Sequence, residues 1–205
     1  MPDLQKDSKE NHNSTHFQVS ETCAYFFNDI ARIKAADYLP TADDILRART
    51  RTTDIQRATF KFDSILMEFI DVGGQRCERP KWLPLRDEAT AVIYTAAISE
   101  YDQYLKEDKQ TLRLTEALVL FEDVSREFAN KAVILFLNKY DLFVEKIKHV
   151  PLQIWDYDGD GSCEGASKFI ESRFREVAEY QKDFYVHFTC AVDTNNIRTI
   201  FNNVK

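Results

Sequence analysis

The chain has 205 residues, of which 44% are hydrophobic and 30% charged, and its formal net charge is -7. This composition is typical of a globular protein with one domain or one domain plus an appendage. The acidic balance argues against a nucleic-acid-binding domain, which normally needs a basic face for phosphate contacts. No apolar run reaches the roughly 18 residues of a membrane-spanning helix, and the polar start predicts no signal peptide. Four scattered cysteines without a CxxC pair favour a reducing compartment.

The N-terminal region predicts a polar arm followed by helices. Residues 1–18 have few large apolar side chains, which is typical of a flexible segment. Apolar residues then recur at helical spacing from Thr22 to Lys34. Further along, Thr41 follows a proline and occupies an N-cap position, which predicts a short helix over Ile45 and Leu46.

The next segment predicts a β-hairpin. Residues 59–62 alternate in the manner of a strand, Asp63 and Ser64 form a turn, and residues 65–72 form a second, more buried strand. We expect this hairpin to be the only antiparallel element.

Three further apolar runs, residues 90–98, 131–137 and 184–190, predict strands. Long amphipathic stretches at residues 106–128 and 167–180 separate them. This alternation predicts an α/β fold with a mostly parallel sheet covered by helices on both faces. In such folds ligands bind beyond the carboxyl ends of the strands, so the residues after each strand are the candidates for a site.

The first candidate is the run DVGGQR at residues 71–76. Asp71 at a strand end can hold a divalent cation through water, and Gly73 and Gly74 let backbone N–H groups approach an anion. Gln75 can orient a water molecule. A glycine turn beside solvated charges would explain the same residues equally well.

The second and third candidates follow the next strands. In the run NKYD, the carboxylate of Asp141 can accept both N–H groups on one edge of a guanine ring. The stem of Lys139 can lie along the base plane, and Asn138 can tie neighbouring loops together. After residues 184–190, the backbone N–H of Ala191 could meet a purine carbonyl. An N-K-x-D run is common by chance, so each signal is weak alone.

Order and spacing make these signals specific. DVGGQR, NKxD about 65 residues later and TCA about 50 residues after that have the layout of a GTPase nucleotide site. The upstream run LRARTRTT at residues 46–53 resembles the first switch of heterotrimeric G-protein alpha subunits, R-x-K-T-T-G. The runs DYLPTADDILRARTRTT, GGQRCERPKWLPLRDEATAVIY, SEYDQYLKED, NKYDLFVEKIKHVPL and HFTCAVDT agree. From residue 20 to residue 205 the chain resembles this family.

The resemblance implies a Ras-like GTPase domain that binds GTP or GDP with Mg²⁺. Arg49 would be the arginine finger and Gln75 would orient the attacking water. Thr52 would bind Mg²⁺, with Asp71 in its outer shell. The Gly74 amide would contact the γ-phosphate. The implied nucleotide contacts are Leu46, Arg47, Ala48, Arg49, Thr50, Arg51, Thr52, Asp71, Val72, Gly73, Gly74, Gln75, Asn138, Lys139, Tyr140, Asp141 and Ala191.

Some positions depart from the family pattern. Asp54 stands where the family has glycine, Arg51 replaces lysine, Val192 replaces a polar residue, and Pro80 interrupts the helix of the second switch. No G-x-x-x-x-G-K-[ST] run occurs in the sequence, so we expect the phosphate loop and the first sheet strand to be missing. The chain thus resembles an alpha subunit cut at both ends. We expect a flexible arm at 1–18, a remnant of the helical domain at 19–46 and an incomplete GTPase domain at 47–205.

Residues 156–161 contain a motif that is not part of this family pattern. The run DYDGDG matches the first half of an EF-hand loop, with oxygens at positions 1, 3 and 5 and glycine at position 6. Position 12 would be Ser167 rather than a bidentate glutamate. We therefore expect weak calcium binding or none.

By resemblance, the first hypothesis is a GTP/GDP switch in receptor-coupled signalling that hydrolyses GTP to GDP and phosphate. Its partners would be a beta-gamma dimer, a G protein-coupled receptor, effectors and GTPase-activating regulators, at the cytoplasmic face of the plasma membrane. Because residue 2 is proline, we expect the family's myristoylation signal to be missing. The second hypothesis is a non-catalytic module that binds partners through Arg76, Lys81 and Trp82, because an exposed tryptophan beside basic residues can anchor an interface.

Overall fold

The computed structural model describes residues 22–48, 50, 52–62 and 64–203. Its centre is a parallel sheet of β3 (Ala91–Ala97), β4 (Ala132–Asn138) and β5 (Phe184–Thr189), in that spatial order. Ala91 lies opposite Ala132, and Val133 lies opposite Phe184. The three parallel strands predicted from the apolar runs are confirmed, with ends shifted by one residue.

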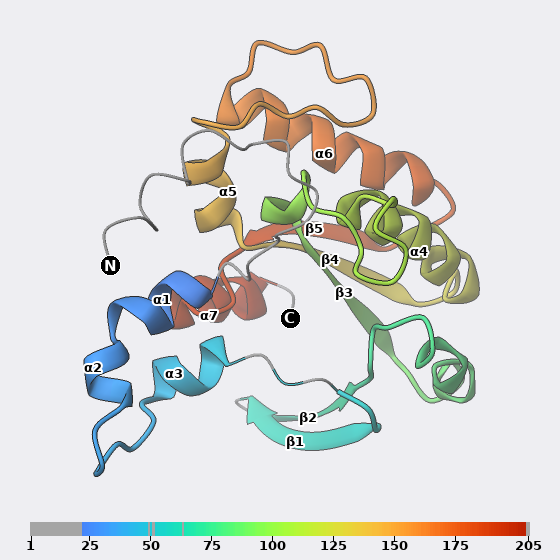
Figure 1. Ribbon diagram of the computed structural model, residues 1–205. Helices are drawn as coiled ribbons and strands as arrows, with labels where there is room; N and C mark the ends of the chain where they lie inside the picture. Colours follow the sequence, from blue (N-terminus) through green and yellow to red (C-terminus); the bar gives the residue numbers. More distant parts are fainter. Residues whose placement is uncertain (1–21, 49, 51, 63, 204–205) are drawn as a thin grey trace.

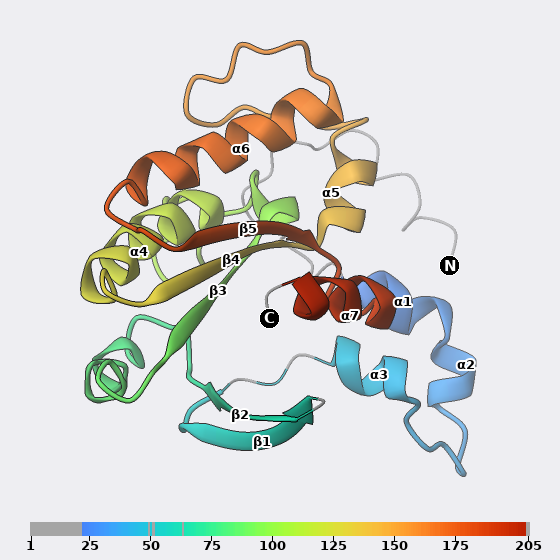
Figure 2. The ribbon, with the colours of Figure 1, turned by 180° about the vertical axis from the view of Figure 1, so that it is seen from behind.

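Helices cover both faces of this sheet, as predicted. α4 (Arg113–Glu127) and α6 (Cys163–Val177) lie on one face, and α7 (Thr194–Asn203) lies on the other (Figure 1, Figure 2). The short helix α5 (Tyr140–Lys146) follows β4 directly. Alternate residues of β4 point to opposite faces, so both cores use the same strand.

The larger core lies between the sheet and helices α4 and α6. Its completely buried side chains include Val133, Leu135, Leu137, Phe121 and Phe174. A smaller apolar cluster lies on the other face, where Ile134 and Phe136 contact Ile200 of α7.

The predicted hairpin is formed by β1 (Gln56–Phe62) and β2 (Ile65–Asp71), paired antiparallel from Gln56–Asp71 to Phe62–Ile65. It is a separate two-stranded sheet, and no ladder joins it to β3. β2 is the more buried of the two strands, as predicted, with two half-buried residues against one in β1, but its first four residues are exposed. The physical reason is that β2 borders an open cavity instead of a third strand. An isolated Tyr104–Leu112 bridge adds a second antiparallel contact.

Aromatic side chains attach the hairpin to the body of the protein. Phe62 stacks on Phe201 of α7 with 5.8 Å between ring centroids, and Phe69 meets the same ring edge-on at 5.9 Å. On the other side of the hairpin, Arg57 donates to both carboxylate oxygens of Glu88, at 2.5 and 2.9 Å.

The segment between β2 and β3 forms two short 3₁₀ helices, η1 (Arg79–Lys81) and η2 (Leu83–Leu85), and η3 (Ile98–Glu100) follows β3. Pro80 lies in the first turn of η1, where its missing N–H costs no hydrogen bond. The second-switch helix implied by the resemblance is thus replaced by two tight turns.

Two helix starts differ from the amphipathic pattern for local reasons. α4 begins at Arg113 rather than near residue 106, because Asp108 binds the backbone N–H groups of Gln110 and Thr111 in a turn. α6 begins at Cys163, because the Ser162 hydroxyl accepts the N–H of Gly165 as an N-cap.

The N-terminal helices are α1 (Cys23–Asn28), α2 (Ile30–Ile33) and α3 (Ala42–Arg47). Thr41 caps α3 in a reciprocal capping box with Asp44, so the predicted N-cap is confirmed. The predicted arm at 1–18 lies outside the described residues. None of the described helices is long and apolar enough to cross a membrane.

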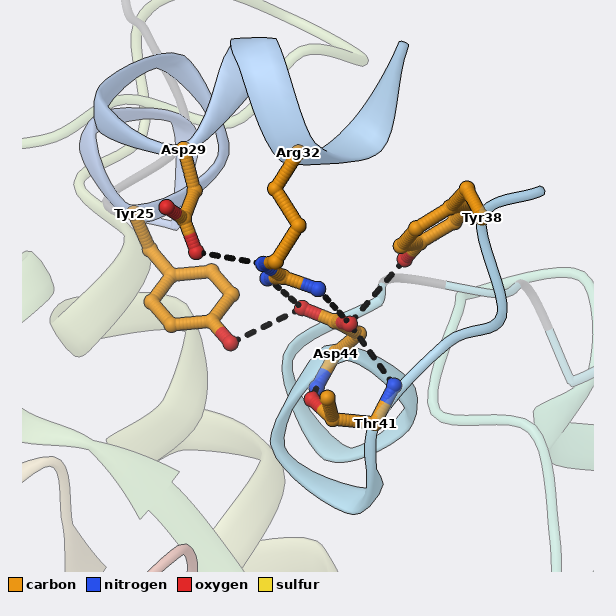
Figure 3. Close-up of polar contacts among 6 residues, drawn as sticks. All are labelled: Tyr25, Asp29, Arg32, Tyr38, Thr41 and Asp44. Atoms are coloured by element: carbon orange, nitrogen blue, oxygen red, sulfur yellow. Dashed lines mark hydrogen bonds and ion pairs between the residues drawn. The ribbon is translucent and has the colours of Figure 1, made fainter. Parts of the chain in front are cut away.

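Asp44 joins these helices through a buried carboxylate that is only 2% exposed (Figure 3). Arg32 donates to both of its oxygens at 2.8 Å, and the hydroxyls of Tyr25 and Tyr38 donate at 2.8 and 3.0 Å. The backbone N–H of Thr41 completes the set. These donors hold the pKa of Asp44 well below its ordinary value, first through the Arg32 hydrogen bonds. Tyr25, Arg32, Tyr38, Thr41 and Asp44 are named here the Asp44 cluster. Among the described residues, the hydrogen bonds to Asp44 come from α1–α3 and their connections.

Candidate functional site

The ends of β4 and β5 are tied together by one side chain. The side-chain oxygen Oδ1 of Asn138 accepts from the Thr189 hydroxyl at 3.0 Å and from the Ala191 N–H at 3.1 Å. These residues are more than 50 positions apart in sequence. These two contacts are the ones expected of Asn138 as a link between neighbouring loops, and its part in nucleotide binding stays a prediction.

The residues that follow Asn138 surround the same edge of the sheet. Lys139 adopts the left-handed conformation with φ 60° and precedes α5. Asp141 lies in the first turn of α5 and is exposed. Its carboxylate also lies beside Cys190, where burial first and Asp141 second raise the pKa of the thiol. The structure therefore gathers Asn138, Lys139, Asp141 and Ala191 into one cluster, named here the base cluster.

Tyr140, the variable residue of NKxD, packs into the layer beneath. Its ring lies 4.9 Å from that of Phe188 and 6.3 Å from that of Phe143. It supports the base cluster from the core side, and the predicted direct nucleotide contact stays a prediction.

A second cluster forms where β2 ends. The Thr52 hydroxyl lies 3.5 Å from a carboxylate oxygen of Asp71. A Cβ on Gly73 would lie 2.5 Å from the Thr52 carbonyl oxygen and 2.7 Å from Glu78, so only glycine fits there. Gly74 has open space on its Cβ side, which leaves its backbone accessible. Thr52, Asp71, Val72, Gly74 and Gln75 form what is named here the phosphate-side cluster.

Residues 76–86, which include η1 and η2, are named here the second-switch segment after the family region that they resemble. Their side chains hold this cluster in place. Trp82 donates its indole N–H to the Gly73 carbonyl at 3.0 Å. Lys81 donates to the Thr53 carbonyl at 2.6 Å and to Glu78 at 2.5 Å, so it links the two switch segments directly.

The same segment is bound to α4. Arg76 and Arg79 both pair with Glu116, at 2.7 and 2.6 Å. The two guanidinium groups, Arg76 first, lower the pKa of Glu116 to about 2. Trp82 is half-buried and hydrogen-bonded, which fits neither a pure core residue nor a fully exposed interface anchor.

The donor set of the phosphate-side cluster fits Mg²⁺ but does not form a complete cage. Mg²⁺ binds oxygen ligands, keeps several waters and usually takes one or two protein ligands plus substrate phosphates. The Thr52 hydroxyl and the Asp71 carboxylate supply two such oxygens side by side. Over the described part of the chain there is no group of three or more His, Cys, Asp or Glu side chains that could hold a metal.

A cavity of about 1560 Å³ connects the phosphate-side cluster with the facing edges of β2 and β3. Its walls include Thr50, Thr52, Asp71, Gly74 and Gln75. The base cluster does not line it. The structure therefore places the predicted site residues in two clusters, one on the cavity wall and one at the ends of β4 and β5.

Other predicted contacts lie apart from these clusters or outside the described residues. The Arg47 guanidinium lies over the Tyr25 ring at 4.8 Å, on the side of the Asp44 cluster. Leu46 is 57% exposed and Ala48 is exposed. Arg49 and Arg51 lie outside the described residues, so the placement of the predicted arginine finger stays untested.

One residue of the site was not predicted. Glu100 ends η3 directly after β3, lines the cavity and pairs with Lys139 at 2.5 Å. Its position directly after β3 agrees with the rule that ligand-binding residues follow the strands, but in the sequence the run SEYDQYLKED at residues 99–108 indicates only the family resemblance.

The EF-hand-like run has no ligand at its twelfth position. Ser167 is 4% exposed, and its hydroxyl donates to the Cys163 carbonyl within α6. A calcium ion in this loop would have to draw Ser167 out of the core.

The comparisons with known proteins agree with this arrangement. The family model described as G-protein alpha subunit matches residues 5–205. The chain belongs to the G-protein alpha subunit family. It is 45% identical to the guanine nucleotide-binding protein alpha-4 subunit of Dictyostelium discoideum over 194 residues, which is 93% of this chain and 56% of that protein.

Other relatives give the same result. The alpha-6 subunit of Dictyostelium discoideum is 45% identical over 92% of this chain, and the alpha-4 subunit of Caenorhabditis briggsae is 45% identical over 93%. The chain spans about half the length of these curated relatives, 56% and 55% respectively. The predicted family and the Ras-like α/β fold are thereby confirmed.

Proposed function

We propose that this alpha-subunit chain binds guanine nucleotides and acts in a GTP/GDP switch. The observation that carries the proposal is the Asn138 side chain, which holds the ends of β4 and β5 together at 3.0 and 3.1 Å. This contact supports a guanine-reading role for Asp141 and Ala191, because it brings a carboxylate acceptor and a backbone donor to one edge of the sheet. The relatives are named guanine nucleotide-binding proteins, which supports the same ligand.

We infer that the phosphate-side cluster serves the other end of the nucleotide. The open approach to the Gly74 backbone suits a γ-phosphate oxygen. Gln75 would orient the attacking water, and Arg49 would place positive charge on the transferring phosphoryl group. Thr52 would bind Mg²⁺, with Asp71 in its outer shell, and the ion would neutralise phosphate charge. Hydrolysis of GTP to GDP and phosphate would then release the contacts that order the two switch segments.

The partners and location of the protein belong to the same proposal. A beta-gamma dimer, a G protein-coupled receptor, effectors and GTPase-activating regulators are the partner classes expected of the family, at the inner face of the plasma membrane. The fixed position of the second-switch segment between Thr53 and Glu116 supports its use as a contact face.

A second candidate is a non-catalytic module that binds partners through this face. It is favoured by a groove of about 130 Å³ between the second-switch segment and α4, lined by Trp82, Leu83 and Phe128 among others. Binding that persists without any nucleotide would favour this reading over the switch.

The base-reading assignment is tested by one substitution. In a version of the chain preceded by the phosphate-loop region of a family member, we expect GDP to bind in preference to ADP. Asp141→Asn exchanges two acceptors for a mixed amide edge, so preference should move from guanine to xanthine nucleotides. Competition binding with GDP, XDP and ADP measures this. Unchanged guanine selectivity in the variant would show that Asp141 does not read the base.

A further inference from the structure

Glu100 stands between the two clusters of the predicted site. It ends the 3₁₀ turn that follows β3, so it lies at the same carboxyl edge of the sheet as Asn138 and Thr189. It also lines the cavity that contains Thr52 and Asp71.

Both carboxylate oxygens of Glu100 are engaged by cations. Oε1 lies 2.5 Å from the Lys139 ammonium, and Oε2 lies 3.0 Å from the Arg113 guanidinium. Arg113 is itself fixed, because its Nε donates to the Tyr104 carbonyl at 3.1 Å. Lys139, Glu100 and Arg113 thus join the ends of β4 and β3 to the first turn of α4.

The surroundings make this chain of contacts stronger than a surface ion pair. The side chains of Glu100 and Arg113 are only 18% and 16% exposed. Burial opposes the charged carboxylate, yet the two cations together hold the pKa of Glu100 below its ordinary value. A partly buried, doubly paired carboxylate has one preferred position and therefore fixes what it binds.

The contact with Glu100 restricts the flexible side chain of Lys139. Its backbone has φ 60°, which is uncommon for a residue with a side chain, and four flexible bonds separate that backbone from the ammonium group. A free lysine stem would sample many rotamers, each of which would have to be frozen when a base packs against it. An ammonium already anchored on Glu100 lowers this entropic cost.

We propose that Glu100 is a positioning residue for guanine recognition, which anchors the Lys139 ammonium on Arg113-braced oxygens so that the lysine stem is preset for the base. This inference rests on the proposed nucleotide function and adds to it a residue that acts through Lys139. Glu100 does not touch the base itself.

The base cluster lies entirely within this chain, so the 205-residue protein can be tested directly with GMP and AMP as probes. Backbone amide shifts in ¹H–¹⁵N spectra give the dissociation constants at millimolar nucleotide. We expect the unaltered protein to prefer GMP and Glu100→Gln to bind GMP about tenfold more weakly, the lower end expected for a charge-assisted contact. Glu100→Asp, which keeps the charge on a shorter side chain, should fall between them.

Two controls separate positioning from general structure. Asp102→Asn removes a neighbouring carboxylate that pairs at 2.5 Å with Lys146, away from the base cluster, and should leave GMP affinity within about twofold. In a Lys139→Met background, Glu100→Gln should cause no further loss, because the residue through which it acts is gone. Thermal unfolding midpoints of all variants check that each protein folds.

The outcomes are distinct. The positioning role would be overturned if Glu100→Gln weakened GMP binding equally in the unaltered and the Lys139→Met backgrounds, or did not weaken it at all. The proposed guanine site would stand in either case. An unaltered protein that shows no preference for GMP over AMP would overturn the proposed base cluster, and the role of Glu100 with it.

Discussion

A single buried carboxylate organises the N-terminal helices. Asp44 accepts from Arg32, Tyr25, Tyr38 and the Thr41 backbone, so its negative charge is matched by donors on every side. Because the fold holds its pKa below the ordinary value of 3.8, folding favours the ionised form. Its contribution to stability is therefore complete above the unfolded pKa and is lost as the pH falls through the lower folded value.

The first prediction concerns the pH dependence of this cluster. Asp44→Asn should lower the thermal unfolding midpoint at pH 7, and its difference from the unaltered protein should shrink below about pH 4, where the unfolded carboxyl becomes protonated. Asp43→Asn, an exposed neighbour in the same helical turn, is the matched control and should shift the midpoint little. Midpoints measured from pH 7 down to pH 2 decide the question. A difference that stays constant over that range would contradict the role of ionised Asp44.

The second prediction concerns the two residues that we propose to be catalytic, Gln75 and Arg49. Gln75 is exposed beside the phosphate-side cluster, and its backbone carbonyl accepts the N–H of Glu78. In the version with a phosphate loop, Gln75→Leu and Arg49→Cys should leave GTP binding nearly intact and slow hydrolysis. The arginine contributes on the order of 10³-fold or more to the rate in this class of enzyme. Single-turnover hydrolysis measures this, with GTP affinity as the internal control. Unaltered rates in both variants would show that neither residue is catalytic.

At the scale of elements, the hairpin depends on a small aromatic contact with the last helix. Phe62 and Phe69 of the hairpin both meet Phe201 of α7, and the backbone ladder joins β1 and β2 only to each other. An isolated two-stranded hairpin is marginally stable in water. We therefore expect the stability of the hairpin to depend on the packing of these three rings.

The third prediction tests that dependence. Phe201→Ala should destabilise the protein by about 1–3 kcal/mol, less than the loss for a fully buried ring because Phe201 is half-buried. Urea unfolding measures the loss, and hydrogen exchange should show reduced protection of amides in β1 and β2 with little change in β4. Tyr180→Ala, a ring 64% exposed after α6, is the control. Unchanged exchange in the hairpin would mean that other contacts hold it.

The sequence predicted the parallel strands well because a buried strand needs a continuous apolar run, and residues 131–137 supply one. It predicted Thr41 as a cap because capping is local. The exposure of β2 could not be predicted, since it depends on which strand lies beside it. The Glu100–Lys139 pair spans 39 residues and exists only once β3 and β4 are paired. The start of α4 depended on the turn at Asp108, which no apolar pattern records.

At the scale of the whole molecule, the two site clusters are supported by different structures. The base cluster belongs to the ends of β4 and β5 over the main core, whereas the phosphate-side cluster follows the hairpin and borders the cavity. Within the described residues, the cavity-facing edges of β2 and β3 take part in no strand ladder. Ile65, Leu66 and Ile93 along this cavity are 52%, 72% and 38% exposed. Apolar side chains beside unpaired strand edges favour self-association.

The last prediction follows from this division. The 205-residue chain should show no saturable GTP binding at micromolar concentrations, although we expect its base cluster to bind guanine at millimolar concentrations. Its sequence contains no G-x-x-x-x-G-K-[ST] loop, and in that loop backbone donors and a lysine hold the phosphates. Each missing charge-assisted hydrogen bond is worth roughly 1.5–3 kcal/mol, so several together weaken binding by many orders of magnitude.

Isothermal titration calorimetry with GTP and Mg²⁺ tests this directly, with light scattering to follow self-association. Asp54→Gly restores the residue typical of the family near the expected phosphates and should not by itself bring micromolar binding, because it adds no donor. Stoichiometric, Mg²⁺-dependent binding by the unaltered chain at micromolar concentrations would contradict the prediction. The two clusters would then have to close on the nucleotide across the cavity, and the 205 residues alone would form a complete switch.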